Sequence, residues 1–192
     1  MPSPTKNARR TVPDLLLAAA NEANDDGNYA RAYALFDAAF QLLPVLSSQI
    51  SAANMLLKLG HASRALQAYD EIPVSQLSEK AAALVHRKRG EAQQAVAGGK
   101  DVADPPPSFS VEEVLMRGGQ QANASGDTQL ARDAYLACGG ALAKLSAANM
   151  LLKLGDAPGA IAEYSALDTG ALGDAAAVLR RKLAEAELRD ER

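Results

Sequence analysis

Few side chains of this chain could do acid–base, nucleophilic or metal chemistry. The candidates are two histidines, His61 and His86, one cysteine, Cys138, and the adjacent carboxylates Asp25 and Asp26. Such chemistry needs several groups at set spacings, for example a histidine beside a nucleophile or a cluster of ligands. Neither histidine has a neighbour of that kind, so we interpret both as surface residues. Cys138 is interpreted as a small core residue and the aspartates as a helix end. We expect no catalytic site, no metal site and no cofactor, and the protein is not expected to be an enzyme.

The chain repeats itself. The ten residues SAANMLLKLG occur at Ser51–Gly60 and again at Ser146–Gly155, 95 positions later. The match continues downstream, where Ala81–Ala92 resembles Ala175–Ala186, and it weakens upstream. An internal duplication of this kind has to be identified before the fold is inferred. It indicates two homologous halves.

A shorter period lies within each half. Four glycines each have an alanine five residues later and an aromatic residue nine residues later; they are Gly27, Gly60, Gly126 and Gly155. Glycine allows the positive φ of a tight turn, and alanine lets two helix axes approach closely. The pattern therefore predicts helical hairpins with glycine turns.

These residues resemble the tetratricopeptide repeat. Gly27–Pro44 follows the pattern Gly-x-Tyr-x-x-Ala-x-x-x-Phe-x-x-Ala…Pro of that family throughout, Leu59–Ile72 and Leu154–Leu167 match well, and Ser125–Cys138 matches more loosely. The resemblance implies an all-α fold, an α-solenoid of antiparallel helix hairpins, with two hairpins and a capping helix in each half.

Four segments are expected from this pattern and from the Pro and Gly positions. They are a flexible N-terminal tail at 1–11, a first half at 12–97, a Pro/Gly linker at 98–109 and a second half at 110–190. Three consecutive prolines in the linker favour a semi-rigid polyproline II spacer. The expected helices are 12–24, 29–42, 47–59, 63–71 and 77–96 in the first half, and 111–124, 129–138, 142–154, 158–166 and 172–189 in the second.

The last helix of each half is expected to close the stack with a polar outer face. That face would hold His86, Arg87, Lys88, Arg89 and Glu91 in the first half and Arg180, Arg181, Lys182, Glu185, Glu187 and Arg189 in the second. An alternative is that the Gly90–Ala95 spacing marks a degenerate third repeat. The basic residues could contact acidic partners, but a solvated face is the simpler interpretation.

In the tetratricopeptide repeat family, which this chain resembles, the first helix of each hairpin lines a concave groove. On this analogy the polar groove residues are Asn24, Asn28, Asn54 and Lys58 in the first half and Asn123, Asp127, Asn149 and Lys153 in the second. An asparagine amide can both donate to and accept from the backbone of an extended peptide. The alternatives are that these side chains are merely solvated, or that Asn54 and Asn149 pair internally.

The resemblance and the lack of catalytic groupings predict a non-catalytic protein–protein interaction scaffold. The partner would be a protein or peptide, and the chain would be an adaptor subunit of a larger complex. One alternative is a small chaperone for a secretion or assembly client; another is an accessory domain of an enzyme. Self-association through exposed Leu and Ala at the ends of the stack also stays open.

Composition agrees with these expectations. The net charge of −3 argues against general nucleic-acid binding, and no apolar run approaches the roughly 20 residues of a membrane helix. One cysteine is compatible with a reducing compartment. We therefore expect a cytoplasmic protein without membrane insertion. Organelle targeting by the basic N-terminus, with Lys6, Arg9 and Arg10, is left open.

Overall fold

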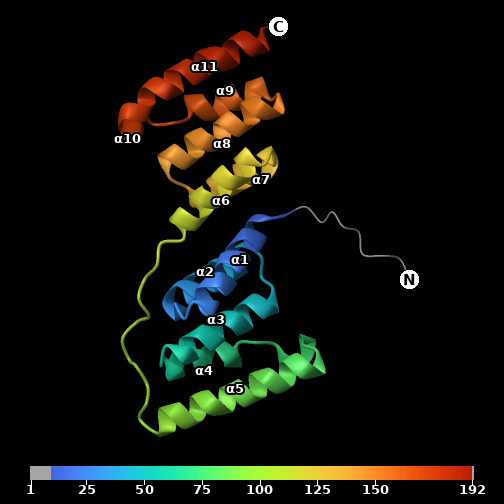
Figure 1. The fold of residues 1–192 in the computed structure, drawn as a ribbon, viewed down its shortest axis with the longest axis vertical. Coiled ribbons are helices and arrows are strands. Elements are labelled where there is room, and N and C mark those ends of the chain that lie inside the picture. Colours follow the sequence, from blue (N-terminus) through green and yellow to red (C-terminus); the bar gives the residue numbers. More distant parts are fainter. Residues whose placement is uncertain (1–9, 192) are drawn as a thin grey trace, which may run out of the picture. The chain divides into compact units, whose positions relative to one another are not determined.

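The computed structural model describes residues 10–191, and every regular element in that range is a helix (Figure 1). Most of the expected tail, residues 1–9, lies outside the described residues. The chain divides into two compact units, one formed by Pro13–Val111 and the other chiefly by residues 112–191. No helix among residues 10–191 has the length and apolar character needed to cross a membrane.

The first half begins with four helices that make two hairpins. They are α1 (Val12–Asp25), α2 (Tyr29–Leu42), α3 (Leu46–Lys58) and α4 (Ala62–Asp70). A 3₁₀ turn (Val74–Gln76) leads to the long helix α5 (Glu79–Ala97), and Ser78 caps α5 by accepting the backbone N–H of Ala81 at 3.3 Å. Helix α4 packs between α3 and α5, so α5 closes the first stack.

The second half repeats this order. Its hairpins are α6 (Glu112–Ala124) with α7 (Thr128–Cys138) and α8 (Ala141–Leu154) with α9 (Ala157–Ser165). The prediction of a single helix over 172–189 is wrong. The chain forms a short helix α10 (Thr169–Leu172), a 3₁₀ turn (Gly173–Ala175) and α11 (Ala176–Asp190), because Gly173 has a φ of 52° that no continuous right-handed helix permits.

The four turn glycines have the conformation that their spacing predicts. Their φ values are 74° at Gly27, 86° at Gly60, 85° at Gly126 and 87° at Gly155. Residues with a Cβ adopt such values only with strain. Each glycine thus ends the first helix of a hairpin and lets the second helix fold back against it.

The two halves bury equivalent residues. The first core cluster includes Ile50, Ala53, Ala65, Tyr69, Val85 and Ala92, and the second includes Leu145, Ala148, Ala160, Tyr164, Leu179 and Ala186. These are the same positions of the duplicated unit, taken in order. The alanines allow close helix packing, and the tyrosines fill the space beneath the capping helix. The all-α, tetratricopeptide-like stack of hairpins with a capping helix in each half is confirmed.

Candidate partner-binding groove

A pocket of about 370 Å³ lies on the side of the first half where α1, α3 and α5 meet. It is lined by Asn21, Asn24, Phe36, Ser51, Asn54, Met55, Leu57, Lys58, Lys88 and Glu91. Three of the four residues expected in the first groove, Asn24, Asn54 and Lys58, therefore line one hollow. The first helices of the successive hairpins, together with the capping helix, supply most of its wall, so we refer to it as the first groove.

Lys58 is held in place by two contacts. Its ammonium donates to Asn24 Oδ1 at 2.8 Å, from α3 to α1, and lies 4.5 Å from the centroid of the Tyr29 ring. A cation over an aromatic face is attracted by the ring quadrupole. The ammonium has three protons and is solvent-exposed, so it keeps donors for a ligand while its position is fixed.

Asn54 is joined to the second helix of its own hairpin. The hydroxyl of the buried Tyr69 donates to Asn54 Oδ1 at 2.7 Å. The internal pairing considered for Asn54 is therefore present, with a tyrosine as the partner. The bond occupies the amide oxygen and leaves the amide nitrogen as the polar group that Asn54 offers to the groove. Burial raises the pKa of Tyr69, so the hydroxyl stays a donor.

The second half contains the same network. Lys153 Nζ donates to Asn123 Oδ1 at 2.7 Å, and the Tyr164 hydroxyl donates to Asn149 Oδ1 at 2.7 Å. Thr128 stands where the first half has Tyr29, so the ring beneath the lysine is present in the first half only. Apart from that ring, the duplication has preserved this polar arrangement.

Two further residues that were predicted to line the grooves, Asn28 and Asp127, cap helices. Asn28 and Asp127 precede α2 and α7, and their side-chain oxygens accept the backbone N–H of Arg31 at 3.2 Å and of Leu130 at 3.1 Å. These are N-cap contacts, which satisfy donors that a helix start leaves unpaired. Asn28 is absent from the lining of the first groove.

The capping helix α5 contributes to the first groove two side chains that were predicted to lie on its outer face. Lys88 and Glu91 of α5 line the first groove and pair with each other at 2.6 Å, so the outer-face expectation is wrong for them. In the second half Lys182 and Glu185 of α11 pair in the same way at 2.7 Å. The charge pattern alone could not decide this, because both residues would also be soluble on a free face.

His61 is not a surface residue. It is only 3% exposed, and its Nδ1 lies 3.0 Å from the carbonyl oxygen of Val102. The Val102 N–H in turn donates to the Gly60 carbonyl at 2.9 Å, so the start of the expected linker is bound to the α3–α4 turn. Sequence spacing gave no signal for a contact between residues about forty positions apart.

Cys138 is half-buried at the end of α7 and not fully in the core. Its Sγ lies 3.7 Å from the Glu112 carbonyl oxygen, and burial raises the pKa of its thiol. A raised pKa keeps the thiol protonated and lowers its reactivity.

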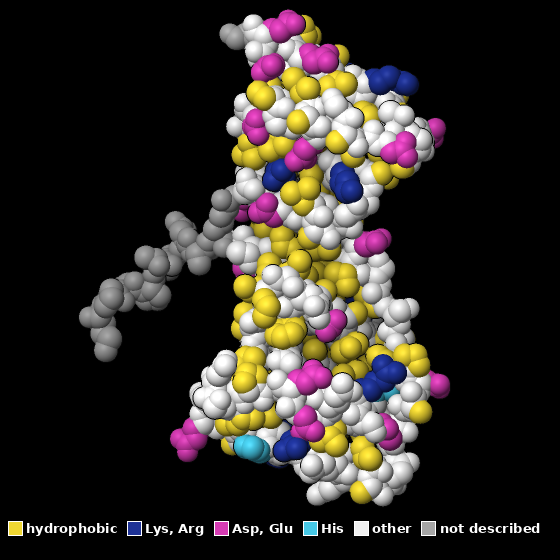
Figure 2. Space-filling model, turned by 180° about the vertical axis from the view of Figure 1, so that it is seen from behind, with side chains coloured by type: hydrophobic (Ala, Val, Ile, Leu, Met, Phe, Trp, Pro, Cys, Tyr) yellow, Lys and Arg dark blue, Asp and Glu magenta, His cyan; other side chains and the backbone are white. Residues whose placement is uncertain are grey.

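On the face of the molecule seen in Figure 2, acidic and basic side chains are scattered between hydrophobic ones and form no extended basic patch.

No family model matches the chain, and no curated protein matches it. Among solved structures, the chain is similar to a thermophilic TPR protein of Thermus thermophilus, with 20% sequence identity over 92% of this chain and 100% of that chain and a TM-score of 0.36.

Proposed function

We propose that the protein is a non-catalytic interaction scaffold that holds a protein or peptide partner in the grooves of its two halves, as an adaptor subunit of a larger assembly. In this proposal the segments 12–97 and 110–190 each carry one groove, and residues 98–109 connect them. The single observation that carries the proposal is the shared hollow of Asn24, Asn54 and Lys58, whose hydrogen bonds recur in the second half.

The chemistry of the first groove suits a peptide. Lys58, Lys88 and the Asn54 amide nitrogen offer donors, and Phe36, Met55 and Leu57 offer apolar surface. A few positioned polar groups within an apolar hollow are typical of binding sites. Stacked helices that present one concave surface are suited to hold a chain segment along its length.

The test compares partner retention by full-length variants in extract from the native cell. Lys58→Glu and Lys153→Glu reverse one charge in each predicted groove, and Lys100→Glu is the matched control on an exposed lysine outside both grooves. We expect a stoichiometric partner to be lost from one or both groove variants and kept by the control. Equal retention by all three variants contradicts the proposal.

The same preparation separates the two versions of the function. A permanent subunit co-purifies with its partner through high salt and size-exclusion chromatography. A chaperone for a secretion or assembly client releases the client and instead suppresses its aggregation. We favour the subunit, because Lys58 and Asn54 are already fixed by intramolecular bonds and form a preorganised surface, whereas promiscuous binding uses flexible surfaces.

A further inference from the structure

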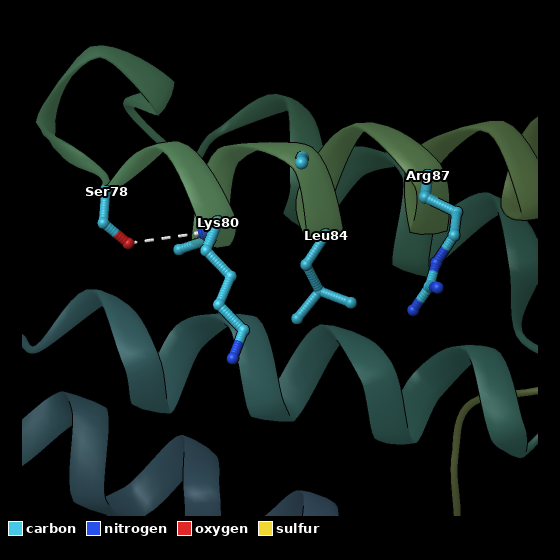
Figure 3. A pocket seen from close by; sticks show the side chains of 6 residues that line it. Ser78, Lys80, Leu84 and Arg87 are labelled. Atoms are coloured by element: carbon cyan, nitrogen blue, oxygen red, sulfur yellow. Dashed lines mark hydrogen bonds between the residues drawn. The ribbon is translucent and has the colours of Figure 1, made fainter.

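The capping helix of the first half carries a second hollow, of about 550 Å³. It is lined by the N-cap and by residues of the first half of α5, namely Ser78, Lys80, Ala81, Ala83, Leu84 and Arg87 (Figure 3). On a helix, Lys80, Leu84, Arg87 and Glu91 follow one another at spacings of four, three and four, so they share one stripe. The hollow and the first groove share no lining residue, but Glu91 at the far end of this stripe lines the first groove.

The hollow combines apolar lining with unneutralised positive charge. Figure 3 shows Lys80, Leu84 and Arg87 pointing to the same side of α5, with the two cations on either side of the leucine. Lys80 has no ion-pair partner within residues 10–191. Arg87 has one long contact, 3.8 Å to Glu91, and its side chain is 68% exposed. Such a contact contributes little.

We propose that this stripe binds an acidic amphipathic helix of the partner, with an apolar side chain on Leu84 and a carboxylate on each of Lys80 and Arg87. Lys80 and Arg87 are seven positions apart, which is about 10.5 Å along a helix. A partner helix with carboxylates seven residues apart and an apolar residue between them has the same spacing. This inference rests on the proposed function, since it names the chemistry of a segment of the same partner.

The second half provides an internal control. At the equivalent positions Asp174 replaces Lys80, Val178 replaces Leu84 and Arg181 replaces Arg87. Asp174 belongs to the 3₁₀ turn before α11, so one end of the stripe has the opposite charge and leaves the helix. An acidic helix would meet a like charge there, and like charges in contact oppose binding. The site is therefore expected in the first half alone.

The test uses full-length protein and a synthetic peptide of about 15 residues, a length at which an isolated helix is marginally stable. The peptide carries two glutamates seven residues apart with a leucine between them, and binding is followed by fluorescence anisotropy. Charge reversal by Lys80→Glu with Arg87→Glu should weaken binding at least about tenfold, since two attractive contacts become repulsive. A peptide with lysines in place of the glutamates should then bind the reversed variant better than the unmodified protein.

Arg181→Glu is the matched control and should leave the affinity unchanged. The swapped peptide excludes misfolding as the explanation, because an unfolded variant would not gain affinity for it. The inference is overturned if the glutamate peptide does not bind, or if it binds the reversed variant as well as the unmodified protein. A natural partner lost with Lys58→Glu but kept by the reversed variant also overturns it, while leaving the proposed function standing.

Discussion

The Asp101 carboxylate caps helix α4 from outside that helix. Its oxygens accept the backbone N–H of Ser63 at 3.0 Å and the Ser63 hydroxyl, across 38 positions of sequence. The residue before α4 is His61, whose side chain makes no cap contact. In the second half the equivalent residue, Asp156, caps α9 itself by accepting the Gly159 N–H at 2.9 Å. The segment after α5 thus supplies the cap that the first half lacks.

Removing this cap should loosen α4 locally. We predict that Asp101→Ala speeds amide hydrogen exchange at Ser63 and at the start of α4, because a helix N-terminus depends on such an acceptor. Adding His61→Asp should restore protection, since an aspartate at that position does for α4 what Asp156 does for α9. Asp156→Ala is the control and should affect α9 only. Unchanged exchange at Ser63 would show that the contact has no energetic role.

The same contact should fail in acid. Hydrogen bonds from the Ser63 hydroxyl and N–H hold the pKa of Asp101 below its usual 3.8. A group whose pKa is lower in the folded state stabilises that state above the unfolded pKa and loses this contribution as pH falls through the folded value. We therefore expect the pH-dependent shift of the Ser63 amide resonance to be centred below pH 3.8. A shift centred above pH 3.8 contradicts this assignment.

The sequence contained most of the fold and part of the groove. Turn glycines such as Gly60 and packing residues such as Tyr69 recur at fixed spacing, so hairpins could be predicted from local chemistry. Asn54 and Lys58 could be placed in a groove because they lie on the repeated helix. The Tyr69 hydroxyl bond had a readable signal, since Asn and Tyr recur 15 positions apart in both halves.

The features that could not be predicted from the sequence are contacts that occur once and do not recur in the other half. Asp101 binds Ser63, and Val102 covers His61, in the first half alone, so no internal comparison indicated them. The same holds for the orientation of α5, where Lys88 turned out to face the groove. Charged residues are compatible with either a free face or a groove wall, and only tertiary packing decides between them.

The paired tyrosines should contribute equally to both halves. Tyr69→Phe and Tyr164→Phe each remove the hydroxyl that donates to Asn54 or Asn149 and leave a part-buried amide oxygen unpaired. Each variant should lose about 1 kcal/mol of unfolding free energy in urea titration. The two losses should add in the double variant, because the two tyrosines belong to separate hydrogen-bonded pairs. A double variant no less stable than either single one would contradict this independence.

Alkaline conditions should destabilise the protein through the same residues. Burial, with a smaller effect of Glu185, raises the pKa of Tyr164 to about 12 from 10, and burial raises that of Tyr69 as well. The folded state then keeps a proton that the unfolded state releases, so stability is full below pH 10 and falls above it. The slope is at most about 1.4 kcal/mol per pH unit for each tyrosine. Tyr164→Phe should flatten this pH dependence, and an unchanged slope would assign it to other groups.

Glycine-to-alanine changes in two helices should have opposite effects. A Cβ added to Gly119 of α6 would lie 2.6 Å from the Tyr135 ring of α7, whereas nothing lies within 4 Å of one added to Gly90 of α5. Both changes gain helix propensity, so Gly90→Ala should stabilise the protein by about 0.5–1 kcal/mol. Gly119→Ala gains the same amount but overpacks the α6–α7 contact, at a cost of about 1–3 kcal/mol. The difference between the two unfolding free energies isolates the clash, and equal stabilisation by both would show that Tyr135 moves aside freely.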